Sequence, residues 1–296
     1  MQKGPVTPKG FGDIMPSEAI KRRKMFNSIA EVLETYGFSP LETPTIEFAE
    51  TLLGKYGEDE KLIYQFEDKG GRKLALRYDL TVPLARFVAN NLALLNPTFA
   101  RYQIGQVFRG DNPQRGRKRE FTQFDFDIVG SSSFEEDVKV IEATIKGARA
   151  IGLNEALLQI NDRTIFDNLG ATTEQIIAID KIDKIGYESV KDLVGKLLDT
   201  LADEEPSERL DKIFSKLKED GFIEGKDFIF NQYLARGLNY YTSMVMELKL
   251  NTTPNSLSIG GGGRYDNLVG MFAGRQIPAV GFSFGIDRIL DLIASS

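Results

Sequence analysis

The stretch VFRGDNPQRGRKREFTQFDFDIVG, residues 107–130, decides how the rest of the chain is interpreted. Two segments rich in alternating apolar residues, Phe99–Arg109 and Phe121–Val129, flank a polar segment. This pattern predicts two strands that face each other across a loop. Side chains two positions apart on a strand point to the same face. The second strand therefore carries three polar groups on one face: Gln123, Asp125 and Asp127.

The loop between these strands is strongly basic, and the first strand ends on a further cation, Arg109. The basic residues of the loop are Arg115, Arg117, Lys118 and Arg119. Such cations bind phosphate through charge-assisted hydrogen bonds, whereas carboxylates accept hydrogen bonds from an ammonium group. The hairpin therefore suits a ligand with phosphates at one end and an amine at the other. A solvated charged hairpin would have the same pattern.

The composition removes several kinds of chemistry, because the sequence contains no Cys, His or Trp. Without Cys there is no thiol nucleophile, and without His the commonest general base is missing. Serine-triad hydrolysis and the usual zinc chemistry are therefore excluded. Catalysis has to rely on positioning and on fixed charges, which arginines, lysines and carboxylates can supply.

Length and charge set broader limits. The chain of 296 residues allows one large domain or a domain with a smaller insert. Its net charge of −6 argues against strong non-specific binding to nucleic acid, although a local basic patch remains compatible with it. No apolar run approaches the length of a membrane span, and the N-terminal residues lack the apolar core of a secretory signal. We therefore expect a cytoplasmic protein without a membrane partner.

Helices and strands follow one another without the regular crossover helices of a parallel sheet. The predicted helices are Ser17–Tyr36, Pro83–Ala93, Phe134–Ile151 and Ile286–Ile293, with Ser17 and Ser133 as caps of the first and third. The further predicted strands are Leu62–Glu67, Lys73–Tyr78, Thr242–Leu250, Leu257–Gly260 and Pro278–Phe284, with a turn at residues 69–71 in the first hairpin. This pattern favours an α+β fold with about six antiparallel strands flanked by helices.

Between residues 161 and 228 charged residues alternate with Leu and Ile at helical spacing, and no strand pattern is present. We interpret this segment as a small helical insert that divides the main domain into residues 1–160 and 229–296. A solvated subdomain without a role in the chemistry is the simpler interpretation of any single residue in it.

Three later segments combine glycines with cations or aromatic residues. They are LARGLNYYTSMVME at Leu234–Glu247, IGGGGRYDNL at Ile259–Leu268 and VGFSFGIDRIL at Val280–Leu290. Glycines let a backbone approach a ligand or a neighbouring strand closely, and a tight turn would use the same residues. Small residues clear space beside Arg288, although most arginines in such a position lie at the surface.

Together and in this order, these segments resemble histidyl-tRNA synthetases, which are class II aminoacyl-tRNA synthetases. Arg109, Asp111 and residues 117–123 are similar to the second class II motif, and GFSFGIDR is similar to the third. LARGLNYY and GGGGRYDNL resemble the two stretches peculiar to the histidine enzymes. PKGFGDIMP (Pro8–Pro16) and LRYDLTVPLAR (Leu76–Arg86) also fit, so the resemblance covers nearly the whole chain.

The resemblance implies a class II antiparallel sheet and ATP-dependent activation of histidine to histidyl-adenylate, followed by transfer to tRNA(His). It implies ATP as a substrate and Mg²⁺ as a cofactor, with no metal site built from the protein alone. Attack of a carboxylate on the α-phosphate needs no strong base, so a protein without His can perform it. The segment Ser17–Pro44 is similar to the first class II motif, which implies a homodimer.

The resemblance also implies a role for each matched residue. The implied catalytic residues are Arg109, which holds the α-phosphate and the carboxylate, and Arg236, which neutralises charge on the α-phosphoryl group. The implied ATP site consists of Arg109, Asp111, Arg117, Phe121 against the adenine, and Arg288 at the γ-phosphate. The implied histidine site consists of Asp79 and Thr81 at the α-ammonium, Leu80, Arg109, Gln123, Arg236 and Tyr240, with Asp127 and Tyr241 against the imidazole.

Some positions depart from the family pattern. Asn239, Ser243 and Met246 stand where Asp, Gly and an aromatic residue are usual, and Thr122 and Phe124 where Tyr and Cys are common. The sequence also ends at Ser296, where these enzymes normally continue into an anticodon-binding domain. We therefore expect tRNA to be held at its acceptor end. The candidate contacts are Arg115, Lys118, Arg119, Lys191 and Lys196.

A regulatory role is the alternative. A synthetase paralogue without the anticodon-binding domain serves as the regulatory subunit of ATP phosphoribosyltransferase in histidine biosynthesis. The absence of an anticodon-binding domain from this sequence favours this alternative. The arginines at 109, 117, 236 and 288 disfavour it, because a subunit that only senses histidine needs no phosphate clamp.

Overall fold

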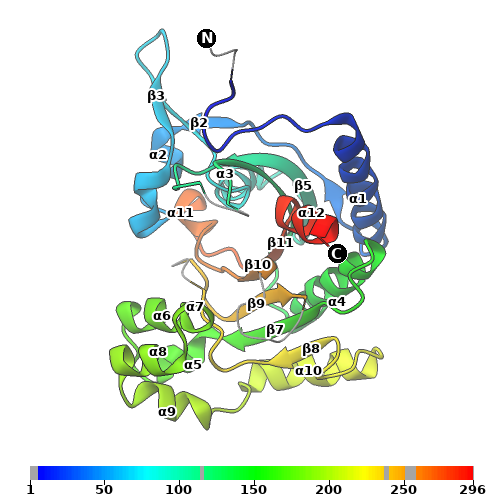
Figure 1. Cartoon of the computed structure of the whole chain (residues 1–296), viewed down its shortest axis with the longest axis vertical. Coiled ribbons are helices and arrows are strands. Elements are labelled where there is room, and N and C mark those ends of the chain that lie inside the picture. The colour runs from blue at the N-terminus through cyan, green and yellow to red at the C-terminus, as the bar shows by residue number, and fades with distance from the viewer. Residues whose placement is uncertain (1–5, 114–116, 237–239, 251–257, 296) are drawn as a thin grey trace.

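The computed structural model describes residues 6–113, 117–236, 240–250 and 258–295. At its centre is an eight-stranded sheet in the order β1-β5-β6-β11-β10-β9-β7-β8 (Figure 1). Its strands are β1 (Ser39–Pro40), β5 (Phe99–Phe108), β6 (Glu120–Val129), β7 (Leu157–Asp162), β8 (Phe228–Phe230), β9 (Met244–Lys249), β10 (Ser258–Arg264) and β11 (Ala279–Gly285). The six central strands are antiparallel, which confirms the predicted α+β class, and the short strands β1 and β8 add in parallel at the two edges.

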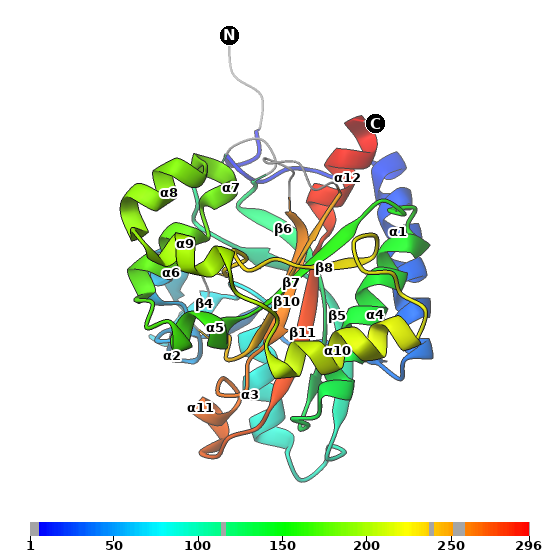
Figure 2. The same cartoon turned by 90° about the horizontal axis from the view of Figure 1, so that it is seen from below.

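The two faces of this sheet differ because the strands alternate. In β6, Phe124 and Phe126 point into the main hydrophobic core, whereas Asp125 and Asp127 point to the opposite face. Four helices cover the apolar face and contribute to the same core: α1 (Pro16–Thr35), α4 (Phe134–Ala150), α10 (Glu208–Glu219) and α12 (Ile286–Ser295). Figure 2 shows α1, α4 and α10 on one side of the sheet and the helices of residues 163–202 on the other.

The helix starts show how local chemistry sets the element boundaries. The predicted cap Ser17 is wrong: α1 begins at Pro16 after Met15, because the fixed φ of proline suits the first helical position. Ser133 does precede α4, but its hydroxyl contacts Glu135 instead of capping the backbone. The helix predicted from Pro83 begins two residues earlier, since the Asp79 carboxylate accepts hydrogen bonds from the first two amides of α3 (Thr81–Asn91).

A second, three-stranded sheet in the order β2-β4-β3 lies beside the main one. It contains β2 (Ile46–Phe48), β3 (Gln65–Glu67) and β4 (Lys73–Leu76), and the predicted hairpin of β3 and β4 is confirmed. Asp68 closes its turn by accepting hydrogen bonds from the amides of Gly70 (2.8 Å) and Arg72 (3.0 Å). This sheet, with α2 (Ala49–Leu52), the 3₁₀ helix η1 (Gly57–Leu62), α3 and α11 (Gly270–Ala273), surrounds a second core.

The predicted insert contains helices with a core of their own. These are α5 (Arg163–Asn168), α6 (Thr173–Ile179), α7 (Ile182–Ile185), α8 (Tyr187–Val194) and α9 (Leu197–Ala202), which form one lobe in Figure 1. Helix α10, which is within the same predicted segment, packs on α4 and contributes to the main core. The boundaries at residues 161 and 228 stay a prediction.

The glycine run was expected to follow a strand that ends at Gly260, and this is wrong. Strand β10 continues through all four glycines to Arg264 and pairs with β9 and β11 on both sides. The glycines are tolerated in a central strand because neighbouring groups fill the space of the missing side chains. A Cβ at Gly261, for example, would lie 2.5 Å from Nη1 of Arg236. Leu257 of the predicted strand lies outside the described residues.

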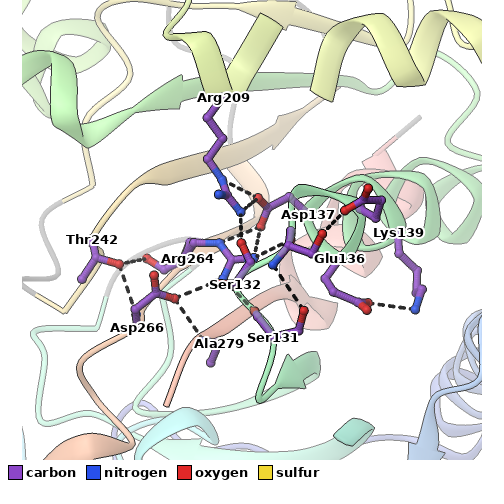
Figure 3. Close-up of polar contacts among 12 residues, drawn as sticks. Ser131, Ser132, Glu136, Asp137, Lys139, Arg209, Thr242, Arg264, Asp266 and Ala279 are labelled. Atoms are coloured by element: carbon purple, nitrogen blue, oxygen red, sulfur yellow. Dashed lines mark hydrogen bonds and ion pairs between the residues drawn. The ribbon is translucent and has the colours of Figure 1, made fainter. Parts of the chain in front are cut away.

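Arg264, at the end of β10, joins three elements in a buried polar network (Figure 3). Its guanidinium donates to Asp137 Oδ1 at the start of α4 (2.6 and 2.9 Å) and pairs with Asp266 (3.1 Å). Arg209 of α10 pairs with the other oxygen of Asp137 at 2.5 Å. Asp137 and Arg264 are both almost inaccessible to water. Arg264 therefore stabilises the fold, and it does not line the cavity described in the next section.

Candidate active site

A cavity of about 840 Å³ lies against the polar face of the sheet. Its walls come from the sheet itself, the region of η1, the start of α3, the loop after β5, helix α6 of the predicted insert, the segment before β9 and helix α12. It brings together residues that are far apart in the sequence. Of the predicted site residues, those that line it are Asp79, Thr81, Arg109, Asp111, Arg117, Phe121, Gln123, Asp127, Arg236, Tyr240, Tyr241 and Arg288. Leu80 does not line the cavity, because its side chain is fully buried below it.

Arg109 is held between two aromatic rings. Its guanidinium carbon lies 4.2 Å from the ring centroid of Tyr78 and 5.1 Å from that of Phe121, and its Nε donates to the Tyr78 carbonyl at 3.2 Å. Cation–π contacts fix the direction of a guanidinium without neutralising its charge. The cation therefore remains available to an anion in the cavity.

Four arginines share this part of the cavity. Burial lowers the pKa of Arg288, and the positive charges of Arg117, Arg109 and Arg236 lower it further, while Glu247 acts in the opposite direction. Arg288 donates to the Ser258 carbonyl at 3.0 Å. Mutual repulsion of several partly buried cations is relieved by a bound anion. The arrangement therefore fits a ligand with several negative charges.

The cavity also presents acceptors. Asp79 Oδ1 accepts hydrogen bonds from the Tyr56 hydroxyl (2.9 Å) and from the amides of Thr81 (3.1 Å) and Val82 (3.0 Å), while its buried Oδ2 has no hydrogen-bond partner among the described residues. Burial raises the pKa of Asp79, against the effect of these donors and of Arg109. A buried acceptor without a partner favours a ligand that donates to it.

Two more unpaired acceptors lie on β6. Gln123 Nε2 donates to the Ser283 hydroxyl at 2.9 Å, and Gln123 Oε1 is buried without a partner in the described part of the chain. The same is true of Asp125 Oδ1, and burial raises the pKa of Asp125 to about 7. Asp127 differs, because its Oδ2 forms an ion pair with Arg101 (2.7 Å), although no hydrogen bond, and the Tyr265 hydroxyl donates to its Oδ1 (2.5 Å).

Known proteins with the same sequence pattern identify the family. A family model described as "Histidyl-tRNA synthetase" matches residues 10–185 and 184–289. The chain is 42% identical over 325 residues to a protein of Aeropyrum pernix named "Histidine--tRNA ligase", an alignment that covers 97% of this chain and 74% of that protein. The chain belongs to the histidyl-tRNA synthetase family. The resemblance in the sequence motifs is thereby confirmed.

Solved structures of this family have the same fold. The crystal structure of histidyl-tRNA synthetase from Nostoc sp. PCC 7120 superposes with a TM-score of 0.86 at 30% identity, covering 99% of this chain and 76% of that one. A structure from Bacillus halodurans described as an ATP phosphoribosyltransferase regulatory subunit/histidyl-tRNA synthetase has a TM-score of 0.78, with coverage of 97% and 82%. Its identity of 22% shows the shared fold alone.

The basic loop is only partly in the cavity of this family member. Lys118 Nζ pairs with Asp287 at 3.2 Å, and Arg117 Nε lies 3.9 Å from Asp111. Arg119 Nε donates to the Asp111 carbonyl at 2.9 Å, and Arg119 does not line the cavity. Of the remaining predicted tRNA contacts, Arg115 is outside the described residues, and Lys191 and Lys196 do not line the cavity.

Sequence reasoning assigned no role to several residues that shape the cavity. Asp125 shares a face with Gln123 and Asp127, so the alternation already indicated its position. Tyr56 and Arg101, which bind Asp79 and Asp127, carried no comparable signal. The lining also includes residues of the predicted insert, namely Thr173, Glu174, Ile177, Asp180 and Lys181, which only the folding of the chain brings there.

Proposed function

We propose that this chain activates histidine with ATP to form histidyl-adenylate and transfers the histidyl group to tRNA. One observation carries the proposal: a single cavity is lined by four arginines and by three buried acceptors that have no partner among the described residues. A triphosphate fits the arginines and an ammonium group fits the acceptors. Membership of the histidyl-tRNA synthetase family supports histidine, ATP and tRNA as the substrates.

In this proposal the arginines divide the phosphate chain between them. Arg109 holds the α-phosphate and the attacking carboxylate, Arg236 neutralises charge that develops on the α-phosphoryl group, and Arg288 holds the γ-phosphate. Asp111 and Arg117 complete the ATP site, and the adenine lies against Phe121. The reaction then needs alignment of two anions and compensation of their repulsion, without a strong base.

The histidine pocket contains the acceptors of the cavity. Asp79 and Thr81 receive the α-ammonium, with Leu80 shaping the backbone between them, and Gln123 and Tyr240 orient the substrate. Asp127 and Tyr241 read the imidazole. Although both oxygens of Asp127 have a partner, a carboxylate oxygen can accept more than one hydrogen bond.

Magnesium would enter with ATP. No group of three or more Asp or Glu side chains that could hold a metal is found among the residues that the structure describes. Mg²⁺ is commonly held by one or two carboxylates together with substrate phosphates, and Asp111 in the cavity lining fits that mode. When bound, the ion would supply further positive charge at the phosphates.

Amino-acid-dependent ATP–pyrophosphate exchange tests the proposed activity. We expect exchange with histidine and rejection of the other nineteen amino acids by roughly 10⁴ or more, because a wrong ligand leaves buried polar groups unpaired. Absence of exchange with histidine would favour the regulatory alternative, which needs no ATP chemistry. Strong exchange with another amino acid would overturn the substrate assignment.

Contact with tRNA is proposed at the acceptor end, through Lys118 and neighbouring basic residues of the loop. Aminoacylation of whole tRNA(His) compared with an acceptor-stem minihelix tests this. Similar charging of both would support the proposal, whereas charging of whole tRNA that is better by orders of magnitude would contradict it. No helix in the described part of the chain is long and apolar enough to cross a bilayer, and we propose the cytoplasm as the location.

A further inference from the structure

One buried lysine connects the predicted insert to Arg236. Lys249 is the last residue of β9, and its side chain is only 6% exposed. Its ammonium contacts Asp183 of α7 and lies 3.2 Å from Glu247 Oε2. The other oxygen of Glu247, Oε1, accepts from Arg236 Nη1 at 3.2 Å. A continuous series of ion pairs, which we call the Lys249 network, therefore runs from Asp183 through Lys249 and Glu247 to Arg236.

The strand geometry fixes the middle of this network. Glu247 and Lys249 are two positions apart on β9 and share its polar face, while Met246 and Leu248 point into the main core. Asp183 lies on a helix next to α6, which lines the cavity. Although burial acts in the opposite direction, the pairs with Asp183 and Glu247 raise the pKa of Lys249, so the ammonium keeps its charge.

Strand β10 also constrains the position of Arg236. Its guanidinium lies over Gly261 of β10, where a side chain would collide with it. A free carboxylate can bind a guanidinium through both oxygens, in a bidentate pair. If Glu247 did so, it would compete with a phosphate for the donors of Arg236. Lys249 occupies Oε2, which leaves Glu247 one contact with Arg236 and leaves other N–H groups of the guanidinium for the substrate.

We propose that Lys249 is a positioning residue of adenylate formation, an inference that rests on the proposed function. It restricts Glu247 to a single contact with Arg236, and Asp183 of the predicted insert fixes Lys249 in this place. The insert therefore contributes to the reaction through the orientation of Arg236, without contact between Asp183 or Lys249 and the substrates. Neither residue lines the cavity.

Lys249→Met tests the central step, because it removes the charge and keeps most of the side-chain volume. We expect kcat of histidine-dependent pyrophosphate exchange to fall about tenfold, the rate equivalent of a coupling between contacting residues. The KM values for histidine and ATP and the melting temperature should change little. Lys249→Arg should restore most of kcat. The matched control is Lys212→Met, which breaks an exposed ion pair with Glu208 on α10 and should leave kcat unchanged.

A double-mutant cycle separates this inference from a general loss of stability. In a Glu247→Gln background, Lys249→Met should have no further effect on kcat, because Lys249 acts only through that carboxylate. Asp183→Asn, at a half-exposed position that tolerates the change, should lower kcat alone and have no effect beside Lys249→Met. The inference would be overturned if Lys249→Met left kcat unchanged. It would also be overturned if Lys249→Met lowered kcat further in the Glu247→Gln protein, or if Asp183→Asn lowered it further in the Lys249→Met protein. A wild-type protein without exchange activity would instead refute the proposed function itself.

Discussion

At the scale of single residues, the cavity is defined by charges that the fold leaves without full compensation. Arg109 rests on aromatic rings instead of a carboxylate, and Arg288 has a backbone carbonyl as its partner. Within the described residues, Asp79 and Asp125 each keep a buried oxygen without a hydrogen-bond partner. Such groups reduce stability and are common where a ligand supplies the missing partner.

Arg236→Ala should lower the rate of adenylate formation far more than it weakens histidine binding. Its proposed partner is charge that develops in the transition state, and the loss of one such donor costs on the order of 3 kcal/mol, or about a hundredfold in kcat. Pre-steady-state pyrophosphate release and equilibrium histidine binding measure the two effects. Arg72→Ala, which removes an exposed arginine of the β3–β4 turn, is the control. Equal losses in rate and binding would show that Arg236 only holds the ground state.

Asp125 should make the stability of the ligand-free protein depend on pH. Burial raises the pKa of the Asp125 carboxyl from 3.8 to about 7. Between these two pH values the folded protein therefore keeps a proton on Asp125 that the unfolded protein has released. The stabilisation from this proton is complete below about pH 4 and is lost as the pH rises to about 7. Asp125→Asn removes that dependence. Urea unfolding of both proteins across this range should show the variant gaining stability relative to the wild type as pH rises, and a constant difference would contradict it.

At the scale of elements, the stability of the site depends on how β10 is attached to the helices behind it. Figure 3 shows Arg264 and Arg209 converging on Asp137, so that one carboxylate joins β10, α4 and α10. The pair of Asp137 and Arg264 is almost wholly buried, which makes it costly to break on one side only.

Asp137→Asn should lower the free energy of unfolding by about 3–5 kcal/mol, because it leaves a buried arginine without its counter-charge. Glu136 provides a matched control on the same helix. Its pair with Lys139 is partly exposed at 2.8 Å, so Glu136→Gln should cost less than about 1 kcal/mol. Urea unfolding of the two variants decides between them. Similar values for both would mean that the buried network contributes no more than a surface ion pair.

At the scale of the whole molecule, several large apolar side chains are exposed in the N-terminal part of the chain. Met15 next to α1, Ile46 and Phe48 of β2 and Phe66 of β3 are between 42% and 64% exposed. Apolar surface of this kind commonly marks an interface. Met15 and Ile46 flank the segment similar to the first class II motif, and we propose that a second copy of the chain covers these side chains about a two-fold axis.

Light scattering should therefore give the mass of a dimer at micromolar protein. Phe48→Asp should shift the equilibrium toward monomer, since burial of a phenylalanine contributes about 1.5–3 kcal/mol and a two-fold interface loses it twice. Leu94→Asp is the control, because Leu94 is 83% exposed in a loop after α3. A monomer mass for the wild type, or an equal effect of both substitutions, would refute this interface.

Much of the architecture follows from the sequence alone. Alternation of polar and apolar residues in β5 and β6 predicts their pairing and their two faces, since a strand that separates a core from a cavity must alternate. The order of the motifs indicates the family. Two helix starts differ from the prediction, because Pro16 and Asp79 set them through rules that compete with serine capping.

What only the tertiary structure decided is which distant groups meet. The glycine run becomes a central strand because Arg236 and the backbone of β11 occupy the space that side chains would need. Asp127 is paired by Arg101 and Tyr265, and Arg236 is linked to the predicted insert through Lys249. Local sequence patterns encode periodicity and turn chemistry, whereas these contacts join residues separated by many positions. Their free energy depends on burial and on neighbouring charges, which exist only once the chain has folded.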